Sequence, residues 1–512
     1  MSDRKKQSAK NSIVGIASFL TKSLLSFVVK TVFIYVLGAE LLGLNSLFSN
    51  VLTILSLAEL GIGSAIVFAM YKPIAEENYD KVNALVKFYK KVYYTIAVVM
   101  IVLGVALLPF LKYIINADNT LSVNIYIVYV MFLLNNIISY FAAHRNALIF
   151  ASQRNDILTE ITMVVGLISS IIQIVVIFLV KDYYVYYSIT LFATALENIC
   201  VYIASNKIYK NLDLKNAKEL NKEEKQSLFK DFKGMLFQKV GGAIISGTDN
   251  IIISAFINLT VLGAYSNYIL ITSSIGSAIW LIVNSIKASV GNLIATRSSD
   301  EVEQIQHKLM FGYFWLNIFC STCLFCLLQH FVTIWLPDEY MLSFFTFTVI
   351  IAGFYIDKTR TLIITFRDAA GLFRYKKWSP VLEALTNLLV SIILVKNMGL
   401  PGVVLGTIIG NVAFPLWVEP WVVYKHYYHK SSKGYWKKWI TYFGVGTLIA
   451  IFTFFICALL PNFGLLWFVL KCGICLVVPN LIMLLVFCRT QEFKYYLNLV
   501  KSLIKRKKKS EE

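Results

Sequence analysis

The stretch GGAIISGTDNIIISAFI, residues 241–257, has the composition of a membrane-spanning helix but contains one carboxylate, Asp249, among isoleucines and small residues. Placing an aspartate at the centre of such a helix costs about 2.5–3.5 kcal/mol on insertion scales. The stretch is therefore either not a membrane helix or holds a charge that the protein uses. The rest of the chain decides between these interpretations.

The composition of the whole chain excludes a soluble globular protein. Of its 512 residues, 58% are hydrophobic and only 15% are charged, whereas a soluble domain has about 25% charged residues. Apolar windows of about 20 residues, the length that spans a bilayer, recur along almost the whole sequence. The first of them, 13–37, follows a basic start, but it is too long for a signal peptide and lacks an A-x-A-like cleavage site, so it is read as the first span.

The apolar windows and the polar breaks between them predict an all-α polytopic membrane protein with about 14 transmembrane helices. We expect these helices to form two six-helix lobes followed by two C-terminal helices. The predicted spans lie near residues 13–37, 43–70, 92–115, 122–144, 159–180, 185–206, 234–257, 261–295, 309–334, 343–366, 378–397, 401–424, 440–460 and 465–488.

Lysine and arginine are distributed unevenly between the two sides of the membrane. With both termini cytoplasmic, the inner segments hold 38 of the 48 basic residues, including the terminal run KSLIKRKKKSEE. The outer loops and their margins hold only Lys112, Lys181, Lys396 and Lys471. This bias follows the positive-inside rule and predicts that both termini are cytoplasmic. It also accounts for the net charge of +19 without nucleic-acid binding.

A long charged segment, residues 207–233, reads as an amphipathic helix and divides the chain. The motif LGLNSLF (42–48) before it resembles LGAYSNY (262–268) after it, in Leu, Gly, Ser and aromatic positions. Repeated lobes with a binding site between them are a common plan of transporters. The predicted domains are an N-terminal lobe (1–206), the cytoplasmic linker (207–233), a C-terminal lobe (234–424), two extra spans (425–488) and a basic cytoplasmic tail (489–512).

The motifs predict neither a metal centre nor an enzyme active site. The patterned cysteines, in CSTCLFC (320–326) and CGIC (472–475), lie in apolar helices without a fourth thiolate or polar surroundings, so we interpret them as small buried hydrophobic residues. The short outer loops contain no paired aspartates, no histidine cluster and no nucleophile with its base. We therefore expect a protein that is not an enzyme and needs no cofactor or metal.

Charged side chains inside the predicted spans are the candidates for a functional site. The basic ones are Lys22, Lys30, Lys239, Lys287, Lys358 and Arg360; the acidic ones at depth are Glu59, Glu197, Asp249 and Asp357, with Glu160, Glu383 and Glu419 nearer the span ends. Charges in a membrane pair with one another or face a water-filled cavity. Pairing is favoured for Asp357 and Arg360 at i, i+3, while Lys30 either reaches the outer headgroups or faces the cavity.

Three of the buried lysines, Lys22, Lys239 and Lys287, have no acidic residue at i±3 or i±4 on their own helix. Cations from both lobes that converge near the midplane would hold a doubly charged phosphate group. The predicted substrate-binding residues are Lys22, Lys30, Lys239, Lys287 and Arg360. The residues predicted to couple an ion or to hold the structure are Glu59, Asp249 and Asp357.

Several motifs together resemble one known family. They are SLAELGIGSAI (56–66), YKPIA (71–75), TDNIIIS (248–254), GAYSNY (263–268), GNL (291–293), FRDAAGLFR (366–374) and PGVVLGTIIGN (401–411). In order and combination they are similar to the oligosaccharide flippases of bacterial polysaccharide biosynthesis, in the multidrug/oligosaccharidyl-lipid/polysaccharide (MOP) exporter superfamily. The resemblance implies two six-helix lobes that alternate access and carry undecaprenyl-pyrophosphate-linked oligosaccharide to the outer leaflet of the bacterial cell membrane. It leaves open coupling to Na⁺ or H⁺ and association with polysaccharide assembly machinery.

The buried charges depart in part from the pattern of the related lipid II flippases, which keep arginines in spans 1, 2 and 8. Here spans 1 and 8 have Lys22, Lys30 and Lys287, but span 2 offers Glu59. Asp249, within TDNIIIS, suits a structural or ion-coupling role better than contact with an anion. Two alternatives stay open, a cation-coupled multidrug antiporter of the same superfamily and a membrane polymerase or ligase. The first needs an acidic or aromatic cavity, and the second needs a large outer loop.

Overall fold

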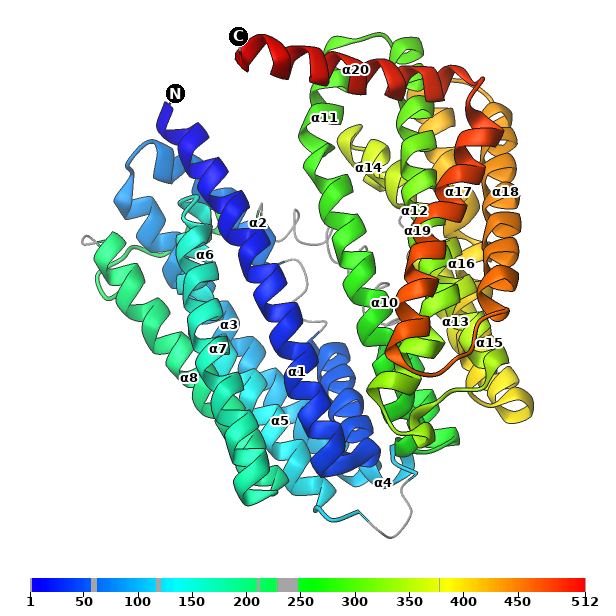
Figure 1. The fold of residues 1–512 in the computed structure, drawn as a ribbon. Coiled ribbons are helices and arrows are strands. Elements are labelled where there is room, and N and C mark those ends of the chain that lie inside the picture. Colours follow the sequence, from blue (N-terminus) through cyan, green and yellow to red (C-terminus); the bar gives the residue numbers. More distant parts are fainter. Residues whose placement is uncertain are drawn as a thin grey trace. The chain divides into compact units, whose positions relative to one another are not determined.

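The computed structural model describes residues 2–56, 62–116, 121–209, 212–226, 228, 247–376 and 378–511. Their side chains are described too, except those of residues 2–20, 22–23, 62, 64–65, 373–374, 500 and 503–511. Every regular element in these ranges is a helix, which confirms the predicted all-α fold (Figure 1). The helices form two compact units, Met1–Gly263 and Ala264–Glu512, and the boundary falls inside helix α10 (Leu259–Ser285).

Unit 1 consists of the N-terminal helices and the start of α10. Asn78, Asn124 and Asp182 begin α3, α5 and α8, because their side chains accept hydrogen bonds from backbone N–H groups of the first turn. The elements are α1 (Ser2–Leu55), α2 (Ile62–Ala75), α3 (Tyr79–Leu107), η2 (Leu108–Phe110), α4 (Leu111–Ile114), α5 (Ile125–Tyr140), α6 (Ala143–Ala151), α7 (Asn155–Val180) and α8 (Tyr183–Ile208).

Helix α1 is two helices joined at Gly38. This glycine has φ 86° and ψ 174°, a conformation that residues with a Cβ avoid. It lies between the predicted first and second spans, 13–37 and 43–70. Helix α1 contains the whole first span, while the second covers the end of α1 and the start of α2, with residues 57–61 outside the described residues. Within the unit, α1 packs against α7, α7 against α8, and α5 against α8.

A close helix crossing joins the second half of α1 to the start of α10 within unit 1. A Cβ added to Gly43 would lie closer than 3.0 Å to the carbonyl oxygen of Leu259, and one added to Gly263 would lie equally close to the carbonyl oxygen of Ala39. These two glycines occupy matching positions in the related motifs LGLNSLF and LGAYSNY. The repeat seen in the sequence thus corresponds to a reciprocal contact between two backbones.

The linker after α8 differs from the expected amphipathic helix. The described residues of the segment 207–233 are 207–209, 212–226 and 228. Residues 207–208, 222–226 and 228 are helical, and residues 212–221 between them are not. The Asp213 carboxylate accepts hydrogen bonds from the backbone N–H groups of Lys215 and Asn216, at 3.0 and 3.1 Å. Such local bonds compete with helix formation. The same bonds, above all the one from Asn216, lower the pKa of Asp213.

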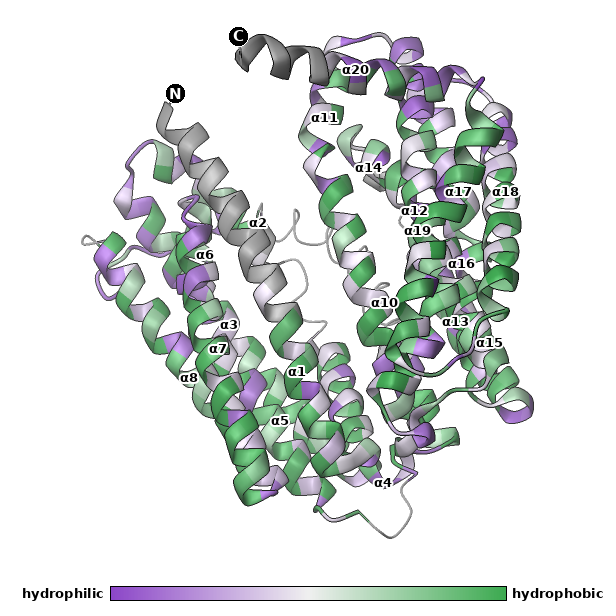
Figure 2. Cartoon of the chain, in the orientation of Figure 1, coloured by the Kyte–Doolittle hydropathy of each residue, from purple (hydrophilic) through white to green (hydrophobic). Residues whose placement is uncertain are grey.

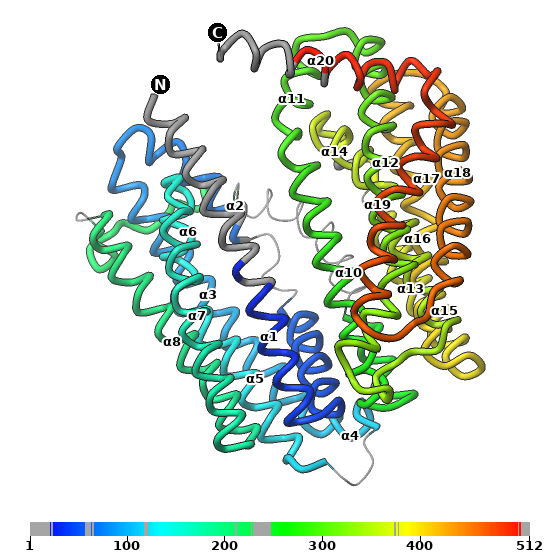
Figure 3. Tube along the Cα trace, in the orientation of Figure 1, coloured from blue at the N-terminus to red at the C-terminus, as the bar shows by residue number. Residues whose placement is uncertain are grey.

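Unit 2 contains the remaining helices, and α20 crosses the end of this unit next to α18 and α19 (Figure 3). Its elements after α10 are α11 (Lys287–Thr296), α12 (Ser299–Trp335), η3 (Asp338–Tyr340), α13 (Phe344–Lys358), α14 (Thr361–Ala369), η4 (Phe373–Lys376), α15 (Ser379–Met398), α16 (Leu400–Ala413), α17 (Pro415–Val423), η5 (Tyr424–Tyr428), α18 (Lys433–Ala458), α19 (Leu465–Phe487) and α20 (Gln491–Glu511).

The pair α15–α16 is the most closely packed hairpin of unit 2. Gly399, with φ 64°, makes the turn between the two helices. On α16, a Cβ added to Gly402, Gly406 or Gly410 would come within 3.0 Å of an atom of α15. Small residues spaced by four let the two helix backbones approach each other, as is common in membranes.

Ten helices of the described residues are long and apolar enough to span a membrane, or eleven if the α5–α6 pair, bent by 43°, counts as one span. Hydrophobic residues follow α16 and α18 along their lengths, and hydrophilic ones gather near α20 (Figure 2). This confirms a polytopic membrane protein. The count of about 14 spans stays a prediction, because most of span 234–257 lies outside the described residues.

Candidate functional site

Nine charged side chains gather in unit 2 around α13, α14 and the elements next to them. We call this set the ionic network. Its members come from α11, α13, α14, η4, α15 and α17, and from Arg360 between α13 and α14. They are Lys287, Asp357, Lys358, Arg360, Arg367, Asp368, Lys376, Glu383 and Glu419.

The buried part of the network is centred on Glu419. Its side chain is fully buried, and its Oε1 and Oε2 lie 2.6 and 2.5 Å from Nη1 of Arg367, itself 1% exposed. Nζ of Lys376 lies 2.6 Å from the same Oε1. Burial lowers the pKa of Lys376, and Glu419 opposes this shift. A carboxylate held by two cations can stay buried, so these contacts lock α14 and η4 to α17.

A second part of the network surrounds Asp357 at the end of α13. Lys358 Nζ and Arg360 Nη2 each lie 2.8 Å from an oxygen of Asp357. Asn411 of α16 donates a weaker hydrogen bond of 3.3 Å to Oδ1, and Glu383 lies 3.9 Å from Arg360. The structure therefore contains the Asp357–Arg360 pair that the i, i+3 spacing predicts.

Two lysines are the accessible cations of the network. The side chain of Lys287 is 47% exposed, and its Nζ lies 3.6 Å from Asp368 Oδ2, a longer contact than those around Glu419. The side chain of Lys358 is 25% exposed and passes next to Gly276 of α10, where an added Cβ would lie 3.0 Å from Lys358 Cε. With five cations and four carboxylates, the network is positive by one charge.

Unit 1 contains a counterpart of Arg367. In both units a longer helix is followed by a short helix of nine residues, α5 by α6 and α13 by α14. Each short helix contains one buried arginine. In unit 1 this is Arg145. Its Nη1 lies 3.0 Å from Ser205 Oγ and 2.5 Å from Asn206 Oδ1, and its guanidinium stacks 4.4 Å from the centre of the Tyr202 ring. The partners of Arg145 are uncharged, whereas Arg367 contacts the carboxylate of Glu419. Both units therefore bury an arginine in a short helix, but its partners differ in charge.

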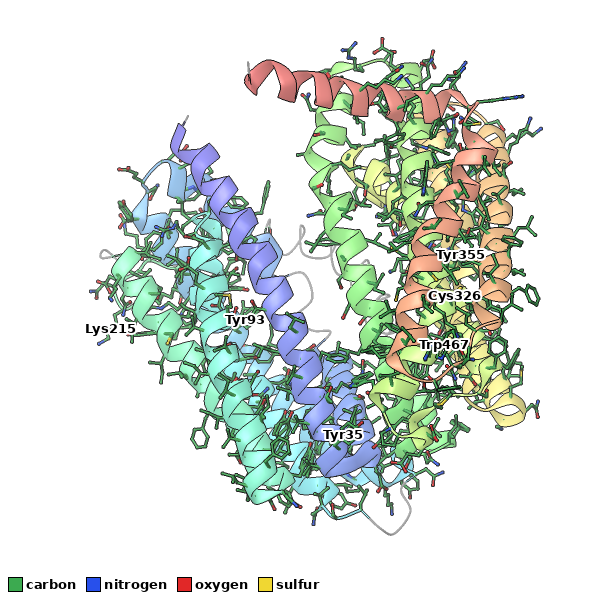
Figure 4. The ribbon with its side chains drawn as sticks, viewed as in Figure 1. Tyr35, Tyr93, Lys215, Cys326, Tyr355 and Trp467 are labelled. Carbon is green, nitrogen blue, oxygen red and sulfur yellow. The ribbon has the colours of Figure 1, made fainter. Side chains whose placement is uncertain are left out.

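Unit 1 also contains a cavity of about 770 Å³ lined mainly by α2, α3, α5 and α6. Tyr89 and Tyr93 meet edge to face in its wall, with ring centres 4.6 Å apart, and Tyr140 packs against Tyr93. Figure 4 labels Tyr93. Asn136 and Ser139 add polar groups to the lining. Aromatic walls with a few polar groups are typical of ligand cavities.

The predicted site residues fall into three groups. Lys287, Arg360 and Asp357 belong to the ionic network of unit 2. In unit 1, Lys30 is half-buried on α1 and Asp249 is buried, in the helical segment 247–256. Lys239 and Glu59 lie outside the described residues, and for Lys22 only the backbone, within α1, is described. Their roles stay predictions.

The sequence interpretation missed the buried half of the network. Arg367 and Lys376 were expected in an inner loop, 367–377, and Glu419 near a span end, whereas Arg367 lies buried in α14. One signal was present in the sequence. A glutamate inside the apolar run PLWVEPWVV needs a cation nearby, and Arg367 and Lys376 provide it.

The chain matches one protein family by sequence and several solved structures by fold. Residues 8–290, more than half of the chain, match the family described as polysaccharide biosynthesis protein. No curated protein sequence matches significantly. The fold is similar to that of the lipid II flippase MurJ in an inward closed conformation, with a TM-score of 0.64 and 15% identity over 93% of this chain and 98% of that one.

Two further structures of the MOP superfamily have a similar fold. One is an inward-facing multidrug resistance MATE family transporter, with a TM-score of 0.60 and 13% identity over 80% of this chain and 98% of that one. The other is a transporter from Pyrococcus furiosus whose binding pocket is described as having reverse polarity, with a TM-score of 0.51 and 12% identity over 82% and 95% of the two chains. Pockets of different polarity thus occur on one fold, so the cargo must be argued from side chains.

Proposed function

Because the chain belongs to the polysaccharide biosynthesis protein family, we propose that it moves undecaprenyl-pyrophosphate-linked oligosaccharide from the inner to the outer leaflet of the bacterial cell membrane by alternating access. The family supports a role in polysaccharide biosynthesis, and the fold, which is similar to that of MOP-superfamily transporters, supports a transporter over an enzyme. The lipid-linked cargo and the leaflet-to-leaflet direction are the proposed part.

The observation that supports an anionic cargo is the excess positive charge of the ionic network, with Lys287 and Lys358 as its accessible cations. A pyrophosphate offers several charged oxygens to such ammonium groups, and charge-assisted hydrogen bonds are about twice as strong as neutral ones. Lys22, Lys30 and Lys239 are proposed to add cations from elsewhere in the chain. The network, with its excess of positive charge, does not provide the acidic lining that an exporter of organic cations needs.

The substitution Lys287→Gln combined with Lys358→Gln tests this function. Each hydrogen bond to a charged group contributes about 1.5–3 kcal/mol, so losing one or both reduces export by roughly tenfold or more. The measurement is lipid-linked oligosaccharide on the inner leaflet, normalised to the amount of protein in the membrane. Lys→Arg at both positions keeps the charge and retains more export than Lys→Gln.

Lys396→Gln is the matched control, because Lys396 is an exposed lysine at the end of α15, outside the network. It is expected to leave export unchanged. Normal surface polysaccharide in the Lys287→Gln, Lys358→Gln variant would reject the role of these lysines. Improved export of organic cations in that variant would favour the multidrug antiporter instead.

The orientation of the chain is proposed from the bias of loop charges and has its own test. Single cysteines in a cysteine-free background are introduced at the exposed positions Lys181 and Phe463, predicted outside, and Glu76 and Ser431, predicted inside. An impermeant thiol reagent added to whole cells is expected to label the first two only. Labelling of the second two alone would reverse the proposed cytoplasmic placement of both termini.

A further inference from the structure

Three buried thiols from three helices meet inside unit 2. Cys326 of α12, Cys457 of α18 and Cys475 of α19 have sulfur atoms that all lie within 4.8 Å of one another. The Sγ atoms of Cys457 and Cys475 are 4.0 Å apart. Figure 4 labels Cys326 between α18 and α19 in that view. Thiolates that share a tetrahedral Zn²⁺ ion, with Zn–S bonds of about 2.3 Å, lie about 3.8 Å apart.

A fourth thiol packs against these three. Cys323 lies one helical turn before Cys326 on α12 and contacts the cluster together with Leu327, Phe454 and Ile474. In the sequence, neither CSTCLFC nor CGIC supplies a full set of ligands. The fold provides it by placing α12 beside α19 and adding Cys457 from α18, a residue outside both motifs.

A buried cation next to the thiols points to negative charge among them. Lys471 precedes Cys475 by one turn of α19 and is only 1% exposed. It donates a hydrogen bond to the side-chain oxygen of Asn462. No aspartate or glutamate of the described residues forms an ion pair with it.

Lys471 and Cys475 are one turn apart on α19, and the sulfur atoms of Cys326 and Cys457 lie within 4.8 Å of that of Cys475. Burying an ammonium without a counter-charge is costly, and thiolates would supply that charge. Several thiolates side by side in turn repel one another unless a cation holds them together.

We propose that Cys326, Cys457 and Cys475, with Cys323 as the fourth ligand, bind one thiophilic divalent ion of the zinc class. Each thiol releases its proton on binding, and Lys471 offsets part of the resulting negative charge. The ion would pin α18 and α19 to α12. The sequence predicts these two helices as extra spans after the C-terminal lobe, 234–424, which contains α12, so the site would fasten the extra spans to that lobe. The inference does not depend on the cargo.

The test is the metal content of the full-length protein, purified in detergent under reducing conditions and supplied with Zn²⁺. About one zinc ion per chain is expected, as for a closed four-cysteine site. The Cys326→Ser, Cys457→Ser, Cys475→Ser variant is expected to lose at least nine-tenths of it. Cys320→Ser and Cys472→Ser, on the same helices but outside the cluster, are matched controls and should retain it.

Co²⁺ in place of Zn²⁺ reports the ligands directly, because thiolate-to-cobalt charge-transfer bands appear only when sulfur is bound. This measurement, and a chelator-induced fall in the melting temperature of the native chain, keep the test valid if the triple variant fails to fold. Zinc no higher in the native chain than in the triple variant would overturn the proposal. So would a Cys457–Cys475 disulfide, seen as a mass loss of two hydrogens in protein purified without metal.

Discussion

Glu419→Gln is expected to remove most of the folded protein from the membrane. The substitution leaves the mostly buried Lys376 without its carboxylate and takes from Arg367 the buried carboxylate of Glu419. Breaking a buried ion pair by removing one partner costs about 3–5 kcal/mol, because the remaining charge is uncompensated. The measurement is the yield of monodisperse protein in mild detergent together with its melting temperature.

A double variant tests whether an uncompensated buried charge causes this loss of stability. Adding Lys376→Gln to Glu419→Gln removes the unpaired cation and leaves Arg367 with Asp368, so the double variant is expected to recover part of the lost stability. Glu303→Gln is the matched control, since Glu303 forms a more exposed pair with Lys430, and such pairs contribute about 1 kcal/mol or less. Equal stability of Glu419→Gln and Glu303→Gln would refute a structural role for the buried half of the network.

Gly43→Ala and Gly263→Ala are each expected to abolish most of the transport activity. The added Cβ would lie within 3.0 Å of a backbone carbonyl oxygen, of Leu259 in the first case and of Ala39 in the second. A backbone atom cannot move aside as a flexible side chain can, so α1 and α10 must separate at this crossing, at a cost of about 1–3 kcal/mol or more. Export is measured as inner-leaflet accumulation of the lipid-linked oligosaccharide, normalised to inserted protein.

Control substitutions and a double variant test whether the close approach of the two helix backbones is the cause. Gly166→Ala in α7 and Gly291→Ala in α11 are matched controls, because an added Cβ meets no atom within 4 Å at either position. They should leave export and the melting temperature unchanged. The two substitutions at the crossing should also be less than additive, since both disturb one contact. Full export by the Gly43→Ala, Gly263→Ala double variant would show that the crossing does not matter.

The fold class and most helix positions were predictable because hydropathy is a local property. A run of apolar residues long enough to cross the bilayer must form a helix there, whatever its neighbours are. The predicted spans 159–180, 185–206, 378–397 and 465–488 therefore fall within helices or end at most a residue beyond them. The break between the first two predicted spans also has a local cause, because Gly38 adopts a backbone conformation that favours glycine.

The structure of the linker, residues 207–233, could not be predicted from its local sequence pattern. Charge spacing over 207–233 favoured an amphipathic helix, but the described residues are mostly irregular. Asp213 bonds its own backbone, and Lys87 of α3 donates a 2.7 Å hydrogen bond to the carbonyl oxygen of Ala217. A contact from a helix more than a hundred residues earlier cannot be read from periodicity.

The pairing of buried charges and thiols depended on the packing of distant segments. Only the Asp357–Arg360 pair was readable from the sequence, because both residues lie on one turn. The partners of Glu419 lie 43 and 52 residues away, and Cys326, Cys457 and Cys475 come from three helices. Spacing along a chain says which residues share one helix face. Which faces meet is set by small residues at close crossings, such as Gly402, Gly406 and Gly410, and by the cost of leaving any charge in the membrane unpaired.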